Sequence, residues 1–192
     1  MPQLNSLQLL ESLKNDIRVL LPKVQEIKEF DESVLNQAPA EGKWSIAQII
    51  EHLNTYNRFY IPTIEKAVRS DDRSFNPRFS PGLIGGYFTK MMQPDSDNRV
   101  KNKMKAAKNH SPVSRLDSAA VISYFEESEQ ELLRLLEEAK KVDLGKVRVP
   151  ISISKLIKLK LGDTFGFLIA HQRRHFVQIA EVIQTLNLVA SS

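Results

Sequence analysis

The stretch LIAHQRRHFVQIAEVI, residues 168–183, decides the fold class of this chain. Its apolar side chains recur at intervals of three and four residues, which is the period of an amphipathic helix with one buried side. His171 and His175 are four residues apart in it, so both imidazoles leave the same side of the helix, one turn apart. A helix uses this spacing to offer two ligands to one metal ion.

A second helical stretch, WSIAQIIEHLNTY, covers residues 44–56 and contains another histidine, His52. Ser45 and Gln48 have the spacing of a capping box, in which the hydroxyl and the glutamine amide each bond to a backbone group of the first turn. Trp44 stands directly before the cap. These signals predict a helix that begins at Ser45 and carries His52 in its second turn.

Three of the four histidines of the chain have matching positions in these two helices. His171 and His175 lie on the flank of their apolar stripe, and His52 has the same relation to its own. We therefore predict one divalent transition metal bound by these three imidazoles, with positions left for water or a ligand. The alternative is a set of partly exposed surface histidines. We expect the fourth, His110, to be solvated in a loop.

Further apolar stripes predict two more long helices. The predicted spans of the four helices are 5–29, 45–64, 117–141 and 163–183, with kinks at Pro22 and Pro62. Together they predict an all-α fold, an antiparallel four-helix bundle. A long crossover, residues 70–116, joins the second and third helices and contains a short helix within 83–93. Residues 146–156 alternate apolar and polar side chains around a proline, which predicts an extended edge segment.

Composition narrows the chemistry. We expect residues 1–192 to form a single domain. The chain has no cysteine, which excludes disulfides and thiolate ligands from the protein, so a metal must be held by imidazole, carboxylate or water. No apolar run approaches the roughly 20 residues of a membrane span. We expect a cytoplasmic protein with no membrane partner.

The net charge of +4 is unevenly spread. Five basic residues and no acidic residue occur in RVKNKMKAAK, residues 99–108. This run lacks the interleaved aromatic side chains that stack on bases, so we expect a solvated surface segment and no nucleic-acid partner.

The tryptophan-led cap, the WSIAQIIEHL helix and the late H-x-x-x-H followed by FVQIAEV together resemble the DinB-like superfamily of four-helix bundles, and its YfiT-like branch in particular. The resemblance covers nearly the whole chain. It implies that His52, His171 and His175 match the metal triad of the family, that the metal is zinc or nickel, and that the protein is a homodimer. Relatives use low-molecular-weight thiols such as bacillithiol or mycothiol as cosubstrates.

Three functions remain open at this stage. The first is a metal-dependent transferase that activates an external low-molecular-weight thiol and acts on a small-molecule substrate. The second is a metal-dependent hydrolase. The third is a non-enzymatic, metal-binding or stress-related module whose basic run contacts an acidic partner. The best supporting residues around the metal, by helical spacing from a ligand, are Gln48, Tyr56 and Gln178.

Overall fold

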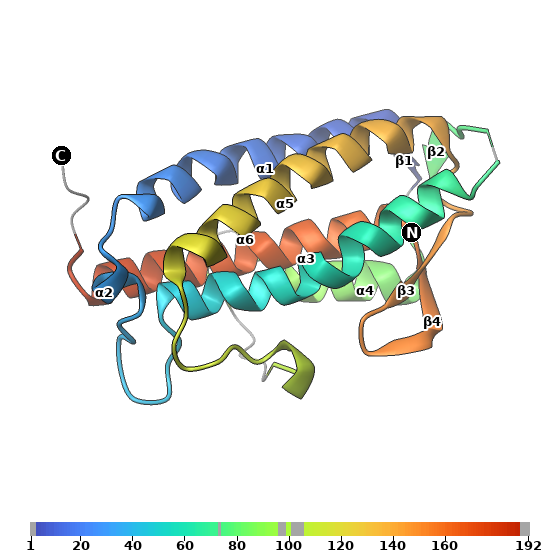
Figure 1. The fold of residues 1–192 in the computed structure, drawn as a ribbon. Coiled ribbons are helices and arrows are strands. Elements are labelled where there is room, and N and C mark those ends of the chain that lie inside the picture. Colours follow the sequence, from blue (N-terminus) through green and yellow to red (C-terminus); the bar gives the residue numbers. More distant parts are fainter. Residues whose placement is uncertain (1–2, 73, 96–98, 101–105, 189–192) are drawn as a thin grey trace.

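A computed structural model describes residues 3–72, 74–95, 99–100 and 106–188 of the chain. Its long helices are α1 (Ser6–Lys28), α3 (Ile46–Arg69), α5 (Ser118–Glu138) and α6 (Leu161–Thr185). α1 packs on α5 and α6, and α3 packs on the same two helices, which closes a four-helix bundle. In Figure 1, α1 and α6 run in one direction while α3 and α5 run in the other. The predicted all-α bundle is confirmed.

The crossover between α3 and α5 follows from these directions. Because α3 and α5 run the same way, the chain must return along the bundle before α5 can begin. The return path contains β2 (Arg78–Phe79), the helix α4 (Leu83–Met92) and the short 3-10 helix η1 (Lys108–His110). The predicted long crossover and its short helix are therefore present.

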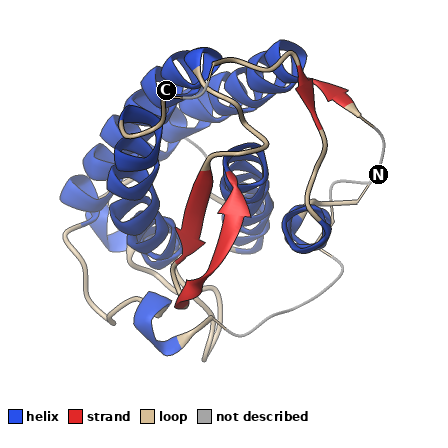
Figure 2. Ribbon diagram, turned by 90° about the vertical axis from the view of Figure 1, so that its right-hand side faces the viewer, coloured by secondary structure: helices blue, strands red, loops and turns tan. Residues whose placement is uncertain are grey.

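The remaining elements are short. They are β1 (Leu4–Asn5), α2 (Glu32–Leu35), the 3-10 helix η2 (Ala139–Lys141), β3 (Arg148–Ile151) and β4 (Ser154–Lys160). β1 pairs antiparallel with β2, and β3 with β4. The extended segment predicted at residues 146–156 is thus only the first part of a hairpin, which lies against the helices in Figure 2.

Helix boundaries follow the sequence signals closely. The capping box of Ser45 and Gln48 is formed at the start of α3. Pro22 and Pro62 lie inside α1 and α3, and each helix continues as one element through its proline. α6 begins at Leu161, before the predicted start, because β4 leads into it without a loop. Among the described residues, no helix is both long and apolar enough to cross a membrane.

The apolar core consists of two clusters that follow one another along the bundle. One includes Leu53 of α3 and Phe176 of α6, and the other includes Tyr60 of α3 and Ile169 of α6. The boundary between the two clusters thus lies between residues 53 and 60 of α3 and between residues 169 and 176 of α6. The clustered histidines lie at this boundary.

Candidate metal centre

The structure brings His52, His171 and His175 together, although His52 precedes His171 by 119 residues. The Nε2 atom of His171 lies 3.2 Å from Nε2 of His52 and 3.0 Å from Nε2 of His175. One ring nitrogen of each residue lies within 4.8 Å of the other two, and all three side chains are buried. The pair leaves α6 one turn apart, as its spacing predicts, and α3 supplies the third ring.

Hydrogen bonds on the far side of two rings fix which nitrogen carries the proton. Nδ1 of His52 lies 2.6 Å from the backbone carbonyl oxygen of His110, and Nδ1 of His175 lies 2.9 Å from Oε1 of Gln178. Both oxygens only accept, so each Nδ1 carries hydrogen and donates it. The Nε2 atoms of His52 and His175 therefore present lone pairs toward His171.

This donor set fits a divalent transition metal. Without a metal, the lone pairs of His52 and His175 Nε2 both point at Nε2 of His171. That atom can carry at most one hydrogen, which both lone pairs would have to share. Nδ1 of His171 is buried and has no hydrogen-bond partner among the described residues. A metal ion at the meeting point would take all three lone pairs at once, and imidazole nitrogen is a ligand that zinc and its neighbours accept readily.

The surroundings keep the three imidazoles uncharged. Burial lowers the pKa of His52 to about 4 and that of His175 to about 3. Burial, and then the neighbouring rings of His175 and His52, hold the pKa of His171 well below its usual range. Because the charged form is disfavoured at each position, the rings are neutral at neutral pH, which is the form that binds a metal.

Residues 20–179 match the sequence model of a family described as the DinB superfamily. The chain belongs to the DinB superfamily. The matched region includes all three clustered histidines and the whole of α3, α4 and α5. The resemblance suggested by the sequence motifs is thereby confirmed at the level of the superfamily.

A solved structure similar to this DinB-superfamily chain is YfiT from Bacillus subtilis, described as a probable metal-dependent hydrolase with an unusual four-helix bundle topology. The two share 13% sequence identity, the match covers 96% of this chain and 87% of that one, and the TM-score is 0.51. At this identity the likeness shows the shared fold. No curated protein matches this chain.

His110 belongs to the centre of this DinB-superfamily chain, and the expectation that it is solvated is wrong. Its side chain is only 3% exposed. Thr55 donates its hydroxyl to the carbonyl of His52 and lies 2.7 Å from Nδ1 of His110, so that nitrogen donates to Thr55. Nε2 of His110 lies 3.0 Å from the hydroxyl of Ser152 in the hairpin turn. Thr55 and Ser152 thus hold the residue whose carbonyl orients His52.

Aromatic rings form the wall around the three histidines. Trp44 lies 5.0 Å from His52 between ring centroids, and the ring of Phe167 is nearly parallel to that of His171 at 5.9 Å. Tyr56 stacks on His110 at 3.9 Å and also contacts His52 and His171. Trp44, which directly precedes the cap of α3, thereby also lies beside the site.

Two of the three predicted supporting residues lie at the cluster. Gln178 accepts from His175, and Tyr56 packs on two of the three rings. Gln48 is not one of them, because its side chain accepts from the backbone of Ser45 and donates to the carbonyl of Val113. Its amide is thus bonded to the capping box and to the loop before α5.

The two arginines between His171 and His175 differ. The helical wheel predicts solvation and surface pairing for both, with Arg174 exposed far from the apolar stripe. Arg173 forms such a surface ion pair, with 3.3 Å between its Nη1 and Oδ2 of Asp16. Arg174 is only 7% exposed, so the expectation that it is exposed is wrong. Its charge contributes to the lowered pKa values of both neighbouring histidines.

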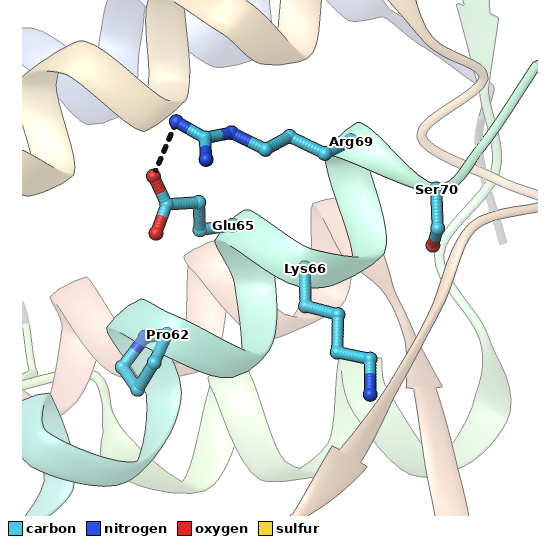
Figure 3. A pocket seen from close by; sticks show the side chains of 5 residues that line it. All are labelled: Pro62, Glu65, Lys66, Arg69 and Ser70. Atoms are coloured by element: carbon cyan, nitrogen blue, oxygen red, sulfur yellow. Dashed lines mark ion pairs between the residues drawn. The ribbon is translucent and has the colours of Figure 1, made fainter.

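A surface depression of about 400 Å³ lies elsewhere, on the C-terminal half of α3. Figure 3 shows its lining residues, Pro62, Glu65, Lys66, Arg69 and Ser70, with an ion pair of 2.9 Å between Glu65 and Arg69. Pro62 is ten residues beyond His52, or about 15 Å along the helix. None of the clustered histidines lines this depression, so we assign no chemistry to it.

Proposed function

We propose that this chain is a metal-dependent enzyme in which His52, His171 and His175 hold one divalent transition metal, zinc or nickel. We further propose that it transfers a low-molecular-weight thiol to an electrophilic small molecule. The observation that carries the proposal is that the Nε2 atoms of three histidines lie together. In His52 and His175 the opposite ring nitrogen, Nδ1, donates a hydrogen bond, so the lone pair of Nε2 points into the cluster.

A divalent metal bound here would lower the pKa of a coordinated thiol or water and so supply a nucleophile at neutral pH. In the transfer, the sulfur forms a bond to the electrophilic carbon, the leaving group departs with its electron pair, and the thiol proton goes to solvent. Because the chain has no cysteine, the sulfur must come from the cosubstrate.

The residues around the cluster have separate tasks in this proposal. The His110 carbonyl and Gln178 hold His52 and His175 in the tautomer that presents Nε2. The rings of Trp44, Tyr56 and Phe167 pack against the three histidines and limit the access of water. This aromatic wall suits a soft sulfur nucleophile, which is weakly hydrated compared with hydroxide.

Hydrolysis is the second candidate, and the likeness in fold to YfiT favours it, because that protein is described as a probable metal-dependent hydrolase. The two reactions differ in what they require. Thiol transfer needs both the metal and an added thiol, whereas hydrolysis needs the metal alone. A third outcome, metal binding without turnover, would leave the chain as a binding module.

The first experiment measures metal content by elemental analysis of the untagged protein and of two variants. His171→Ala removes the central ligand and should lose most of the metal. Arg173→Ala is the matched control, because it changes the same helix between the two ligands but reaches only a surface ion pair. Equal metal content in the two variants would overturn the site.

The second experiment incubates the zinc- and nickel-loaded proteins with low-molecular-weight thiols and electrophiles. Each electrophile is tested with and without a thiol, and each thiol with and without an electrophile. We expect turnover only when metal, thiol and electrophile are all present. Turnover without thiol would replace the transferase with the hydrolase. No turnover in any combination, together with metal retention by the native protein, would favour the binding module.

A further inference from the structure

The outer side of α4 is apolar, which reverses the usual arrangement of a surface helix. Leu83, Ile84 and Tyr87 are 82%, 54% and 64% exposed. The residue buried against the bundle is Gly85, where an added Cβ would lie 2.4 Å from the Cβ of Asp163. α4 thus approaches α6 closely at Gly85, while Phe88 and Met92 pack against the core and Leu83, Ile84 and Tyr87 turn outward.

The β3–β4 hairpin next to α4 has the same character. Ile153, Leu156 and Ile157 at and beside its turn are exposed, Leu156 to 94%. Six of the ten exposed large apolar side chains among the described residues belong to α4 and this hairpin, so the exposure is concentrated in one region. α4 and β4 are in contact, and both elements lie on the side of the bundle away from α1 and α5 (Figure 1).

The same region is basic. Residues 78–93 contain two basic residues and residues 145–160 contain five, and neither segment has an acidic one. Arg148 and Lys160 face each other across the hairpin, and Lys158 stands opposite Pro150. A carboxylate that acts on Arg148 and Lys160 is that of Asp163, at the start of α6, whose charge interacts with both.

We infer that the outer side of α4 and the β3–β4 hairpin bind the surface of an anionic lipid bilayer. The exposed aliphatic side chains enter the boundary between headgroups and acyl chains, and the lysines and arginines meet the lipid phosphates. The expectation of no membrane partner came from the lack of a spanning segment. Attachment to one leaflet requires no such segment.

Other occupants of this surface fit less well. A second copy of the chain, related by a twofold axis, would bring Arg148, Lys158 and Lys160 of the hairpin close to the same three residues of the other copy. A nucleic acid would require flat rings for stacking, and Tyr87 is the one aromatic residue among the six exposed apolar side chains. A bilayer takes up both the aliphatic groups and the positive charge.

The test is flotation of the full-length protein with vesicles of phosphatidylcholine alone and of phosphatidylcholine mixed with phosphatidylglycerol. We expect binding to the mixed vesicles only, weakened by salt. Replacing Leu83 and Leu156 together by Ser should weaken binding by about tenfold or more, because apolar insertion is lost while every charge remains. Both positions are so exposed that the fold should tolerate the change.

The matched control is Val19→Ser, an apolar residue that is 62% exposed on α1, on the other side of the bundle. It should bind as the native chain does. No binding to the mixed vesicles at low salt would overturn the inference. So would equal binding by the double variant and the native chain, which would leave only non-specific attraction to basic residues. Conversion of a dimer to a monomer by the double variant would instead assign this surface to a second copy.

Discussion

At the scale of single residues, the hydrogen bond between Gln178 and His175 gives a direct test of the metal centre. Oε1 of Gln178 accepts from Nδ1 of His175, which keeps Nε2 free for a metal. Gln178→Leu should weaken metal affinity by about tenfold, the lower end of the effect of losing such a supporting bond. Gln178→Glu keeps an acceptor and should restore binding. Gln184→Leu, an exposed change on the same helix, is the control. Competition with a chromophoric chelator measures all three, and an equal effect of both leucine variants would contradict the role.

A second residue-scale prediction concerns a carboxyl group that the sequence did not single out. Glu129 is fully buried, and its Oε1 accepts from the amide of Gln172 at 2.6 Å. Burial raises its pKa from 4.5 to about 8. Between pH 4.5 and about 8 the Glu129 carboxyl keeps its proton in the folded chain and loses it in the unfolded chain. The contribution of Glu129 to the free energy of unfolding is therefore fully present below pH 4.5 and is lost as the pH rises through about 8.

Glu129→Gln stays uncharged at every pH, so the variant should exceed the native chain in stability above pH 8 by on the order of a few kcal/mol. The gap should close toward acidic pH. Urea unfolding across the pH range measures it, and the difference between the two profiles isolates Glu129 because the buried histidines titrate in both. Glu127→Gln, an exposed carboxyl on the same helix, serves as control. A constant difference at all pH values would show that Glu129 is ionised in the folded state.

The sequence predicted the three clustered histidines because helical spacing determines the direction of a side chain. His171 and His175 share one side of α6 whatever surrounds them, and the capping box sets the register of His52. It could not predict His110, which lies in the crossover. No periodic pattern determines where such a segment folds back, and only tertiary packing against Tyr56 and Ser152 buries it.

At the scale of elements, caps and apolar periods predicted all four long helices, whereas the orientation of α4 could not be foreseen. Leu83 and Tyr87 share one side of a helical wheel with Met91, which favours burial of that side. The structure turns Leu83 and Tyr87 outward, because Gly85 allows the backbone to approach Asp163. The amide of Gly82 also donates to the Asp163 carboxylate, over 2.9 Å. Close backbone approach therefore outweighs apolar burial here.

Gly85→Ala tests whether the close approach of Gly85 to Asp163 holds α4 in place. In an open helix the change would stabilise by about 1 kcal/mol. Here the new methyl group would overlap Asp163, so we expect the variant to lose about 1–3 kcal/mol of unfolding free energy, as overpacked sites do. Gly166→Ala is the control in the same contact between α4 and α6, because its Cβ would lie 3.4 Å from Thr89. Urea unfolding compares the two. A Gly85→Ala variant as stable as the native chain would show that α4 is not held by this approach.

At the scale of the whole molecule, the basic run at residues 99–108 lies between α4 and the hairpin in sequence, and half of it falls outside the described residues. Lys101, Lys103 and Lys105 lie in residues 101–105, which the structure does not describe. The proposed contact with an acidic partner through this run stays a prediction. The variant with Leu83 and Leu156 replaced by Ser distinguishes binding through this run from binding through α4 and the hairpin, because it leaves the run intact.

The last prediction is the homodimer, and the positive charge on the outer side of α4 and the hairpin limits where the two chains can meet. A twofold contact through α4 and the hairpin would bring like charges together, so we expect the two chains to meet elsewhere on the bundle. Light scattering of the native protein should give twice the chain mass of 21.9 kDa at micromolar concentration. The variant with Leu83 and Leu156 replaced by Ser should give the same mass. A native mass of 21.9 kDa throughout this range would refute the dimer, and a monomeric variant beside a dimeric native protein would place the contact on the surface that we assign to lipid.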